Sequence, residues 1–245
     1  WVVRHVARGE FLTVHDDDDW SHPRKIQRQV EYLLATGEPA NMSQRARATE
    51  GLLFRRMNNN VEYVQPNFSS LMINVAEIRE NIGEWDEVNR SGDGEFIDRI
   101  AAWRGKPVAV VGEAPLSFQR VREGSLTSGE VLRGYIDTRR KWYELSYKQW
   151  HAKARASGQE RPFLLVAGQV RPFAAPADLE VSPRRRGATH RVDAVIAGDF
   201  RGAGPEFERL AEEIRTLSEA GWAIALTQLN SPVHSIRTGL NPRFL

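Results

Sequence analysis

The sequence contains no cysteine, no long apolar run and almost no net charge. The absence of cysteine among 245 residues excludes disulfides, thiolate metal sites and thiol nucleophiles. Its 34 basic and 32 acidic residues leave a net charge of +2, so no chain-wide field attracts nucleic acid. No run approaches the roughly 20 apolar residues of a membrane-spanning helix, and no signal peptide opens the chain. These absences predict a cytoplasmic protein that binds any phosphate locally.

What is present is an ordinary globular composition, with 41% hydrophobic and 27% charged residues. The chain begins at Trp1 and ends at Leu245, soon after an expected strand. We therefore expect both ends to be cuts in a longer protein.

The first part of the chain alternates strand and helix patterns. Strands are expected at Glu10–His15, Val61–Ile73 and Pro107–Val111, and helices from Ser21 to Gly37, at Val75–Ile82 and at Glu95–Arg104. In the first helix the apolar residues at helical spacing are Ile26, Val30, Leu33 and Leu34. This alternation predicts an α/β domain.

The second part contains a long helix, a linker and a second unit. A helical pattern over 127–157 is rich in aromatic and basic residues, and we expect its aromatic side to pack on the preceding domain. A peripheral contact with the membrane, at the inner face of the plasma membrane, is the alternative. Residues 158–190 are predicted to be a linker. Residues 191–245 predict a β-α-β crossover with a helix from Pro205 to Gly221.

Four consecutive aspartates follow the first strand, at Asp16, Asp17, Asp18 and Asp19. Adjacent carboxylates repel one another, and a divalent cation relieves the repulsion. Oxygen ligands suit Mg²⁺ or Mn²⁺, which usually bridge one or two carboxylates to substrate phosphates. The alternative is a solvated acidic turn that caps the next helix.

The segment Gly9–Leu33 resembles the signature of family 2 glycosyltransferases, in which a strand ends in an Asp-x-Asp element followed by an aromatic residue, His-Pro and a helix. Asp16 and Asp18 match the element, and Asp19 lies beside them. The resemblance implies that Asp16, Asp18 and Asp19 hold the metal, and that Asp16 and Asp17 contact the donor.

Two further stretches carry the resemblance. In Ile82–Ile100 a Gly-x-Trp-Asp turn containing Trp85 precedes a short helix, and Asp93 and Glu95 stand near the family's acidic pair, whose first acid is replaced by Gly92. The resemblance implies that Asp93 is the catalytic base, with Glu95 beside it and Trp85 on the acceptor side. Without the resemblance, both acids would be interpreted as a helix cap and a first-turn acid.

Phe118–Thr127 resembles the family's Arg-x-His-x-Gly-Ser loop, with Arg122 in the histidine position. This implies that Arg120, Arg122 and Ser125 lie near phosphate, although a surface loop with ordinary arginines is the alternative. Gln65–Met72 resembles the strand beneath the acceptor, with Asn67 and Ser69 as contacts.

Together the resemblance implies an incomplete GT-A domain with a mixed sheet over 1–157, followed by the start of a second Rossmann-like domain. It implies inverting transfer from a nucleoside-diphosphate sugar to a glycan or lipid-linked acceptor with Mn²⁺ or Mg²⁺. The fragment alone is expected to be inactive. Large bacterial proteins that join two transferases for surface or wall polymers have this layout. The alternatives are a nucleotidyltransferase or phosphotransferase that uses the same acids, and a non-catalytic carbohydrate-binding domain.

Overall fold

The computed structural model describes residues 2–56, 62–121, 138–166, 168–181, 192–229 and 241–244. The chain divides into two compact units, one of Trp1–Tyr135 with Lys148–Pro172 and one of Ile136–Tyr147 with Phe173–Leu245. Both contain strands and helices, so the predicted α/β class is confirmed. Among the described residues, no helix is long and apolar enough to cross a membrane.

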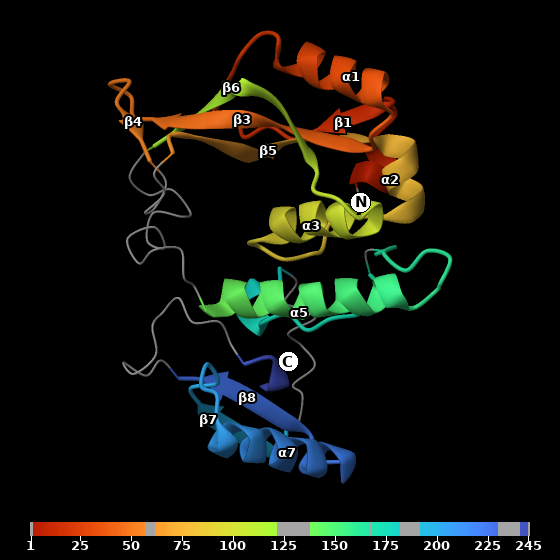
Figure 1. Ribbon diagram of the computed structural model, residues 1–245, viewed down its shortest axis with the longest axis vertical. Coiled ribbons are helices and arrows are strands. Elements are labelled where there is room, and N and C mark those ends of the chain that lie inside the picture. Colours follow the sequence, from red (N-terminus) through yellow and green to blue (C-terminus); the bar gives the residue numbers. More distant parts are fainter. Residues whose placement is uncertain are drawn as a thin grey trace. The chain divides into compact units, whose positions relative to one another are not determined.

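A curled mixed sheet forms the centre of the first unit (Figure 1). It consists of β1 (Phe11–Thr13), β2 (Trp20–Ser21), β3 (Ala40–Ala48), β4 (Phe54–Arg55), β5 (Val64–Asn74) and β6 (Ala109–Arg120). The order is β1-β5-β3-β6-β2, and β4 pairs with the end of β3. Strands β3 and β6 are parallel, whereas the other neighbours are antiparallel. Register shifts near Ser43 interrupt the pairing of β3 on both sides.

Strand β3 lies between β5 and β6, yet the sequence analysis did not identify it. Its sequence, ANMSQRARA, has no β-branched residue, so propensity gives no strand signal. Tertiary contacts hold it instead. Asn41 exchanges two hydrogen bonds with Gln29, at 2.9 and 2.8 Å, and the Ser43 N–H donates to Ser70 Oγ at 2.8 Å.

Helix α1 (Lys25–Thr36) ends at Gly37 as predicted, with Gly37 in the left-handed conformation. Its packed face differs from the apolar pattern. The buried residues are Lys25, Gln29 and Leu33, at intervals of four. Ile26 and Leu34 are 50% and 66% exposed. The helix thus packs a largely polar stripe on the sheet.

Helices α2 (Val75–Asn81) and α3 (Gly92–Arg104) agree with the predicted helices, although α3 begins three residues earlier than expected. Asn74 Oδ1 caps α2 by accepting from the N–H groups of Ala76 and Glu77. The core between these helices and the sheet includes Met42, Leu71, Ile73, Ile78, Ile82, Phe96 and Ile100.

Arg99 is fully buried and joins several segments of this unit. Its Nη1 donates to the Ile82 carbonyl at 3.1 Å and its Nη2 to the Glu84 carbonyl at 2.6 Å. Its Nε lies 3.2 Å from Glu95 Oε1, which is also 3.1 Å from His151 Nε2 on α5 (Thr138–Ala156). The α2–α3 connection, α3 and the second half of α5 therefore meet at one guanidinium.

Part of the predicted linker packs on the first unit. Leu165 donates its N–H to the Ile82 carbonyl at 2.9 Å and accepts from the Glu84 N–H at 2.9 Å. Leu165 and Phe163 are buried. Gly83 lies against this segment with φ +81°, and a Cβ there would stand 2.1 Å from the Leu165 carbonyl oxygen.

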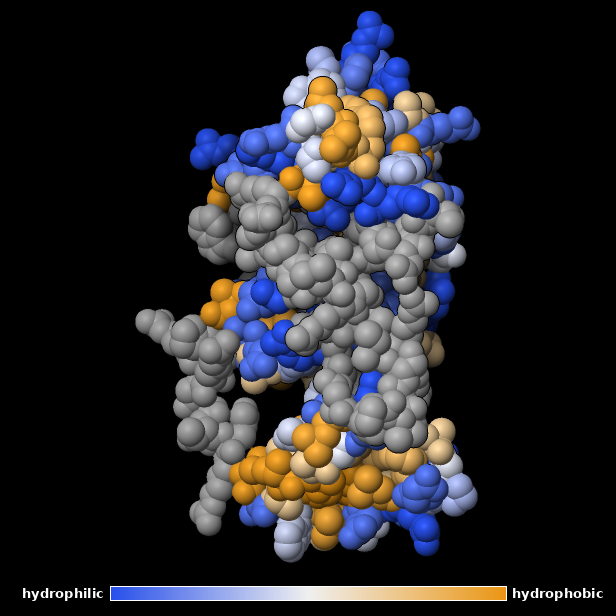
Figure 2. Space-filling model, turned by 90° about the vertical axis from the view of Figure 1, so that its left-hand side faces the viewer, coloured by the Kyte–Doolittle hydropathy of each residue, from blue (hydrophilic) through white to orange (hydrophobic). Residues whose placement is uncertain are grey.

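The second unit contains the predicted crossover: β7 (Ala194–Gly198), α7 (Pro205–Glu219) and β8 (Ile224–Gln228), with β7 and β8 parallel. Phe200 and Phe244 are buried in its core, against Ile196 and Leu226 of the strands and apolar residues of α7. Val195, which alternates with Ile196, is 59% exposed. Apolar side chains accordingly reach the surface of this unit (Figure 2).

Short helical turns complete the described chain: η1 (Val2–Val6), η2 (Ala177–Leu179) and η3 (Pro242–Phe244).

Replacing Gly83 by alanine tests whether the 163–166 segment is docked as described. Gly83→Ala introduces both left-handed strain and a clash with a backbone oxygen. Gly37→Ala is the matched control, because Gly37 also has a positive φ but no atom within 4 Å of a Cβ. We expect the control to lose about 1–2 kcal/mol of unfolding free energy and Gly83→Ala to lose clearly more, measured by urea denaturation. Equal losses would show that the segment is not packed there.

Candidate functional site

The four aspartates lie between two strands at opposite edges of the sheet. Residues 14–19 join β1 at one edge to β2 at the other. Six residues reach at most about 20 Å, and a turn in which the Asp19 N–H donates to the Asp16 carbonyl at 3.3 Å uses part of that length. The curl of the sheet is therefore what allows the acidic loop to bridge its edges.

Asp19 is the acid that the sheet holds most firmly. Its Oδ1 accepts from the backbone N–H of Arg120 at 3.1 Å, and the Gln119 side chain bonds to it as well. Burial raises the pKa of Asp19, and the charges of Asp16 and Asp18 raise it further, against the lowering effect of these hydrogen bonds. The folded protein thus holds Asp19 at an electrostatic cost.

Lys25 lies beneath the acids and was not identified from the sequence. It is 2% exposed, and burial lowers its pKa while Asp19 and Asp16 raise it. A buried ammonium is stable only near negative charge, so Lys25 offsets part of the repulsion among the acids. One sequence signal could have identified Lys25. It lies four residues before Gln29 and eight before Leu33, and these three residues form the stripe of α1 that faces the sheet.

Gln119 connects the acids to the predicted acceptor side. Its Nε2 donates to Asn67 Oδ1 at 3.4 Å, and the same side chain bonds to Asp19. Asn67 is 2% exposed, and Ser69, two residues further along β5, is partly buried. Asp19 and Asn67, 48 positions apart, therefore meet through a residue that the sequence analysis passed over.

Asp93 and Trp85 lie in the α3 region. Asp93 is exposed in the first turn of α3, and its Oδ1 accepts from the Gly94 N–H at 2.8 Å. A Cβ at Gly94 would stand 4.0 Å from the ring of Phe68, the residue after Asn67. Trp85 stacks on Phe96, with ring centres 3.7 Å apart. The start of α3 thus adjoins the strand that carries Asn67.

Glu95 lies in different surroundings from Asp93. It is 0% exposed, and its Oε1 is shared by Arg99 and His151. An acceptor hydroxyl has no open path to a carboxylate enclosed in this way. The arrangement suits a positioning role, in which Glu95 joins α3 to α5, and leaves Asp93 as the accessible acid of the two.

The remaining predicted donor contacts are dispersed. The guanidinium of Arg120 pairs with Glu50, and both side chains are exposed, so Arg120 contributes its backbone N–H to Asp19. Asp17 is exposed and Asp18 is partly buried. Arg122 and Ser125 lie outside the described residues.

A divalent ion is implied by the resemblance. Within the described ranges, no three His, Cys, Asp or Glu side chains are grouped so as to enclose a metal. The donor set of Asp16, Asp18 and Asp19 is nevertheless all oxygen, and the charges of Asp16 and Asp18 add to burial in raising the pKa of Asp19. These residues fit an ion that substrate phosphates also coordinate, rather than one enclosed by protein.

Compared with known proteins, the sequence matches no family model and no curated protein.

The raised pKa of Asp19 predicts the direction in which replacing this residue changes the stability of the protein. Above the raised pKa, Asp19 is ionised in both states, and its charge is less favourable in the folded state than in the unfolded chain, so it lowers the free energy of unfolding. Below the ordinary value of 3.8, Asp19 is protonated in both states and this destabilisation disappears. Asp19→Asn should therefore raise the urea midpoint at pH 7, and its advantage should vanish as the pH falls below 3.8. Asp17→Asn, at an exposed acid of the same loop, should change little. A destabilised Asp19→Asn variant at pH 7 would contradict this assignment.

Proposed function

We propose that the chain is part of an inverting glycosyltransferase of the GT-A type and of family 2, which uses a nucleoside-diphosphate sugar. The observation that carries the proposal is that Asp19 accepts from the Arg120 N–H while the preceding residue, Gln119, donates to Asn67, because these contacts bring the acidic loop next to the strand expected beneath the acceptor. The mixed α/β sheet is compatible with this class of fold.

In this proposal the acidic loop binds the donor. Asp16, Asp18 and Asp19 hold Mn²⁺ or Mg²⁺, which when bound supplies Lewis-acid stabilisation of the departing diphosphate. Lys25 keeps the loop compact by balancing its charge in the absence of donor. The Arg120 N–H and the Gln119 amide fix the Asp19 carboxylate, so its orientation is set before the donor arrives.

Asp93 is proposed as the base that takes the proton of the acceptor hydroxyl as the new glycosidic bond forms. Its exposure leaves it open to an acceptor, and Gly94 adjoins the ring of Phe68 on the acceptor strand. The accepting sugar would lie along β5, near Asn67 and Ser69. The acceptor itself is a glycan or a lipid-linked glycan.

The two-metal phosphotransfer alternative requires the same acids to hold two ions, although no three acids are grouped around even one in the part of the chain that the structure describes. The second unit is proposed to begin a Rossmann-like domain, which the parallel pairing of β7 and β8 supports.

The test is release of nucleoside diphosphate from a panel of donor sugars by the intact protein, with and without Mn²⁺. We expect metal-dependent release, and a fall of at least about 100-fold in the Asp16→Ala/Asp18→Ala double variant. A Glu31→Ala/Glu113→Ala double variant removes two exposed carboxylates elsewhere in the unit and should retain the activity. No release from any donor, with or without acceptor extract, would contradict the proposal.

Asp93→Asn separates the base from donor binding in the same assay. Its kcat for transfer should fall about 10²–10⁴-fold with little change in the KM for donor. Unchanged transfer would exclude Asp93 as the base.

A further inference from the structure

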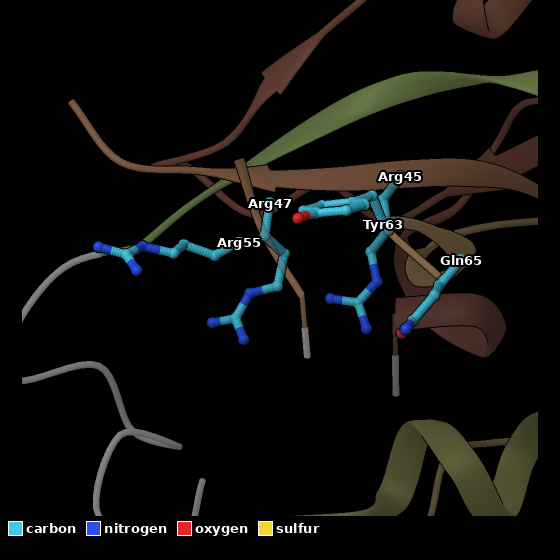
Figure 3. A pocket seen from close by; sticks show the side chains of 5 residues that line it. All are labelled: Arg45, Arg47, Arg55, Tyr63 and Gln65. Atoms are coloured by element: carbon cyan, nitrogen blue, oxygen red, sulfur yellow. The ribbon is translucent and has the colours of Figure 1, made fainter. Parts of the chain in front are cut away.

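Three arginines line an open hollow of the first unit, which we name the arginine pocket. It is lined by Arg45, Arg47, Arg55, Tyr63 and Gln65. The guanidinium groups of Arg45 and Arg47 point the same way, out from the sheet (Figure 3). None of the residues assigned above to donor, metal or base lines this pocket.

Strand register explains why these arginines are neighbours. Arg45 and Arg47 are two residues apart on β3 and share one face of the sheet. Arg47 is directly opposite Arg55 across the antiparallel β3–β4 pair, and Arg45 is opposite Gln65 on β5. Like charges in directly opposite positions destabilise a sheet, so this register carries a cost that a bound anion would remove.

No acidic residue lines the arginine pocket among the described residues. The Nε of Arg47 is buried and has no hydrogen-bond partner in the described chain. The guanidinium carbon of Arg56 lies 5.3 Å from the centre of the Tyr63 ring, which adds a fourth positive charge at the rim. A buried donor without a partner costs free energy unless a ligand satisfies it.

The arginine pocket also adjoins the acidic loop. Arg47 is the register partner of Gln119 across β3–β6, and Gln119 bonds to Asp19. Adjacent strands lie about 4.8 Å apart, which puts the Arg47 backbone about 10 Å from the Asp19 carboxylate. Two sites of opposite charge thus lie on neighbouring strands.

We propose that the arginine pocket binds a phosphate group of the acceptor, so the acceptor is a phosphate-bearing glycan. This proposal rests on the proposed function, in which the donor's diphosphate lies at the acids and leaves the second anionic site for the other substrate. Guanidinium groups match phosphate oxygens in bidentate geometry, and three of them select phosphate over a neutral sugar. The phosphate comes from a lipid-linked diphosphate or from a phosphodiester within a polymer.

The direct test is to measure, by NMR or calorimetry, whether glycerol phosphate binds to the protein. EDTA is present so that no metal ion at the acids can bind the phosphate. We expect saturable binding with shifts at β3, β4 and β5, and none with glycerol. Arg47→Gln/Arg55→Gln should weaken binding at least tenfold. Arg28→Gln, which removes an exposed charge on α1, should leave it unchanged. Absent binding, or equal weakening by Arg28→Gln, would overturn the proposal.

A second measurement guards against a variant that fails to fold. Because the register places like charges opposite each other, Arg47→Gln/Arg55→Gln should raise the urea midpoint at low salt, and phosphate should stabilise the unmodified protein but not the variant. The pocket assignment would be overturned if the double variant were destabilised at low salt and its urea midpoint still rose with phosphate.

Assays with two different acceptors distinguish the two possible sources of the phosphate. Together with the binding test, they also distinguish failure of the arginine pocket proposal from failure of the proposed function. The KM for a lipid-linked diphosphate glycan or for a phosphodiester glycan should rise at least tenfold in the double variant, and the acceptor that shows the rise identifies the source. If the unmodified protein binds glycerol phosphate but releases no nucleoside diphosphate from any donor, the proposed function fails. If it releases nucleoside diphosphate but binds no glycerol phosphate, the arginine pocket proposal fails.

Discussion

The first unit depends on the buried guanidinium of Arg99. Its donors reach the carbonyls of Ile82 and Glu84 and the carboxylate of Glu95, which in turn meets His151. Breaking a buried ion pair by removing one partner typically costs about 3–5 kcal/mol, because the remaining charge is left unpaired. The position of α3, and with it the exposure of Asp93, therefore rests on this buried charge network. This explains why Glu95, two residues from Asp93, serves the fold while Asp93 faces solvent.

The first unit contains two clusters of like charge, each held at a cost. The acids are opposed from below by Lys25, and Asp19 retains a raised pKa despite two hydrogen bonds. The arginines lie opposite one another across β3 and β4. Gln119 is the register partner of Arg47, and the next residue, Arg120, donates its N–H to Asp19. Like charges held close together on a short stretch of sheet are typical of sites where ligands bind.

Local sequence signals predicted where helices and strands begin and end better than they predicted which side chains those elements bury. Gly37 and Gly105 mark helix ends, and Pro205 marks the start of α7, because backbone conformation at these positions is set by the residue itself. Strand β3 was missed because ANMSQRARA forms a strand only through its neighbours. The acidic loop was visible as a candidate site, whereas Lys25, Gln119 and the arginine pocket depend on strand register and helix orientation. No short sequence window contains that information.

The central claim is that the acidic loop, Gln119 and Asn67 form one ligand site, and paramagnetic relaxation by Mn²⁺ tests it most directly. In the intact protein with Mn²⁺ and a nucleoside diphosphate, the account predicts the strongest NMR broadening for the amides of Asp16–Trp20 and Arg120, followed by the side-chain amides of Gln119 and Asn67. Broadening centred on other exposed acids, such as Glu212 and Glu213 of α7, with these signals unaffected, would contradict it.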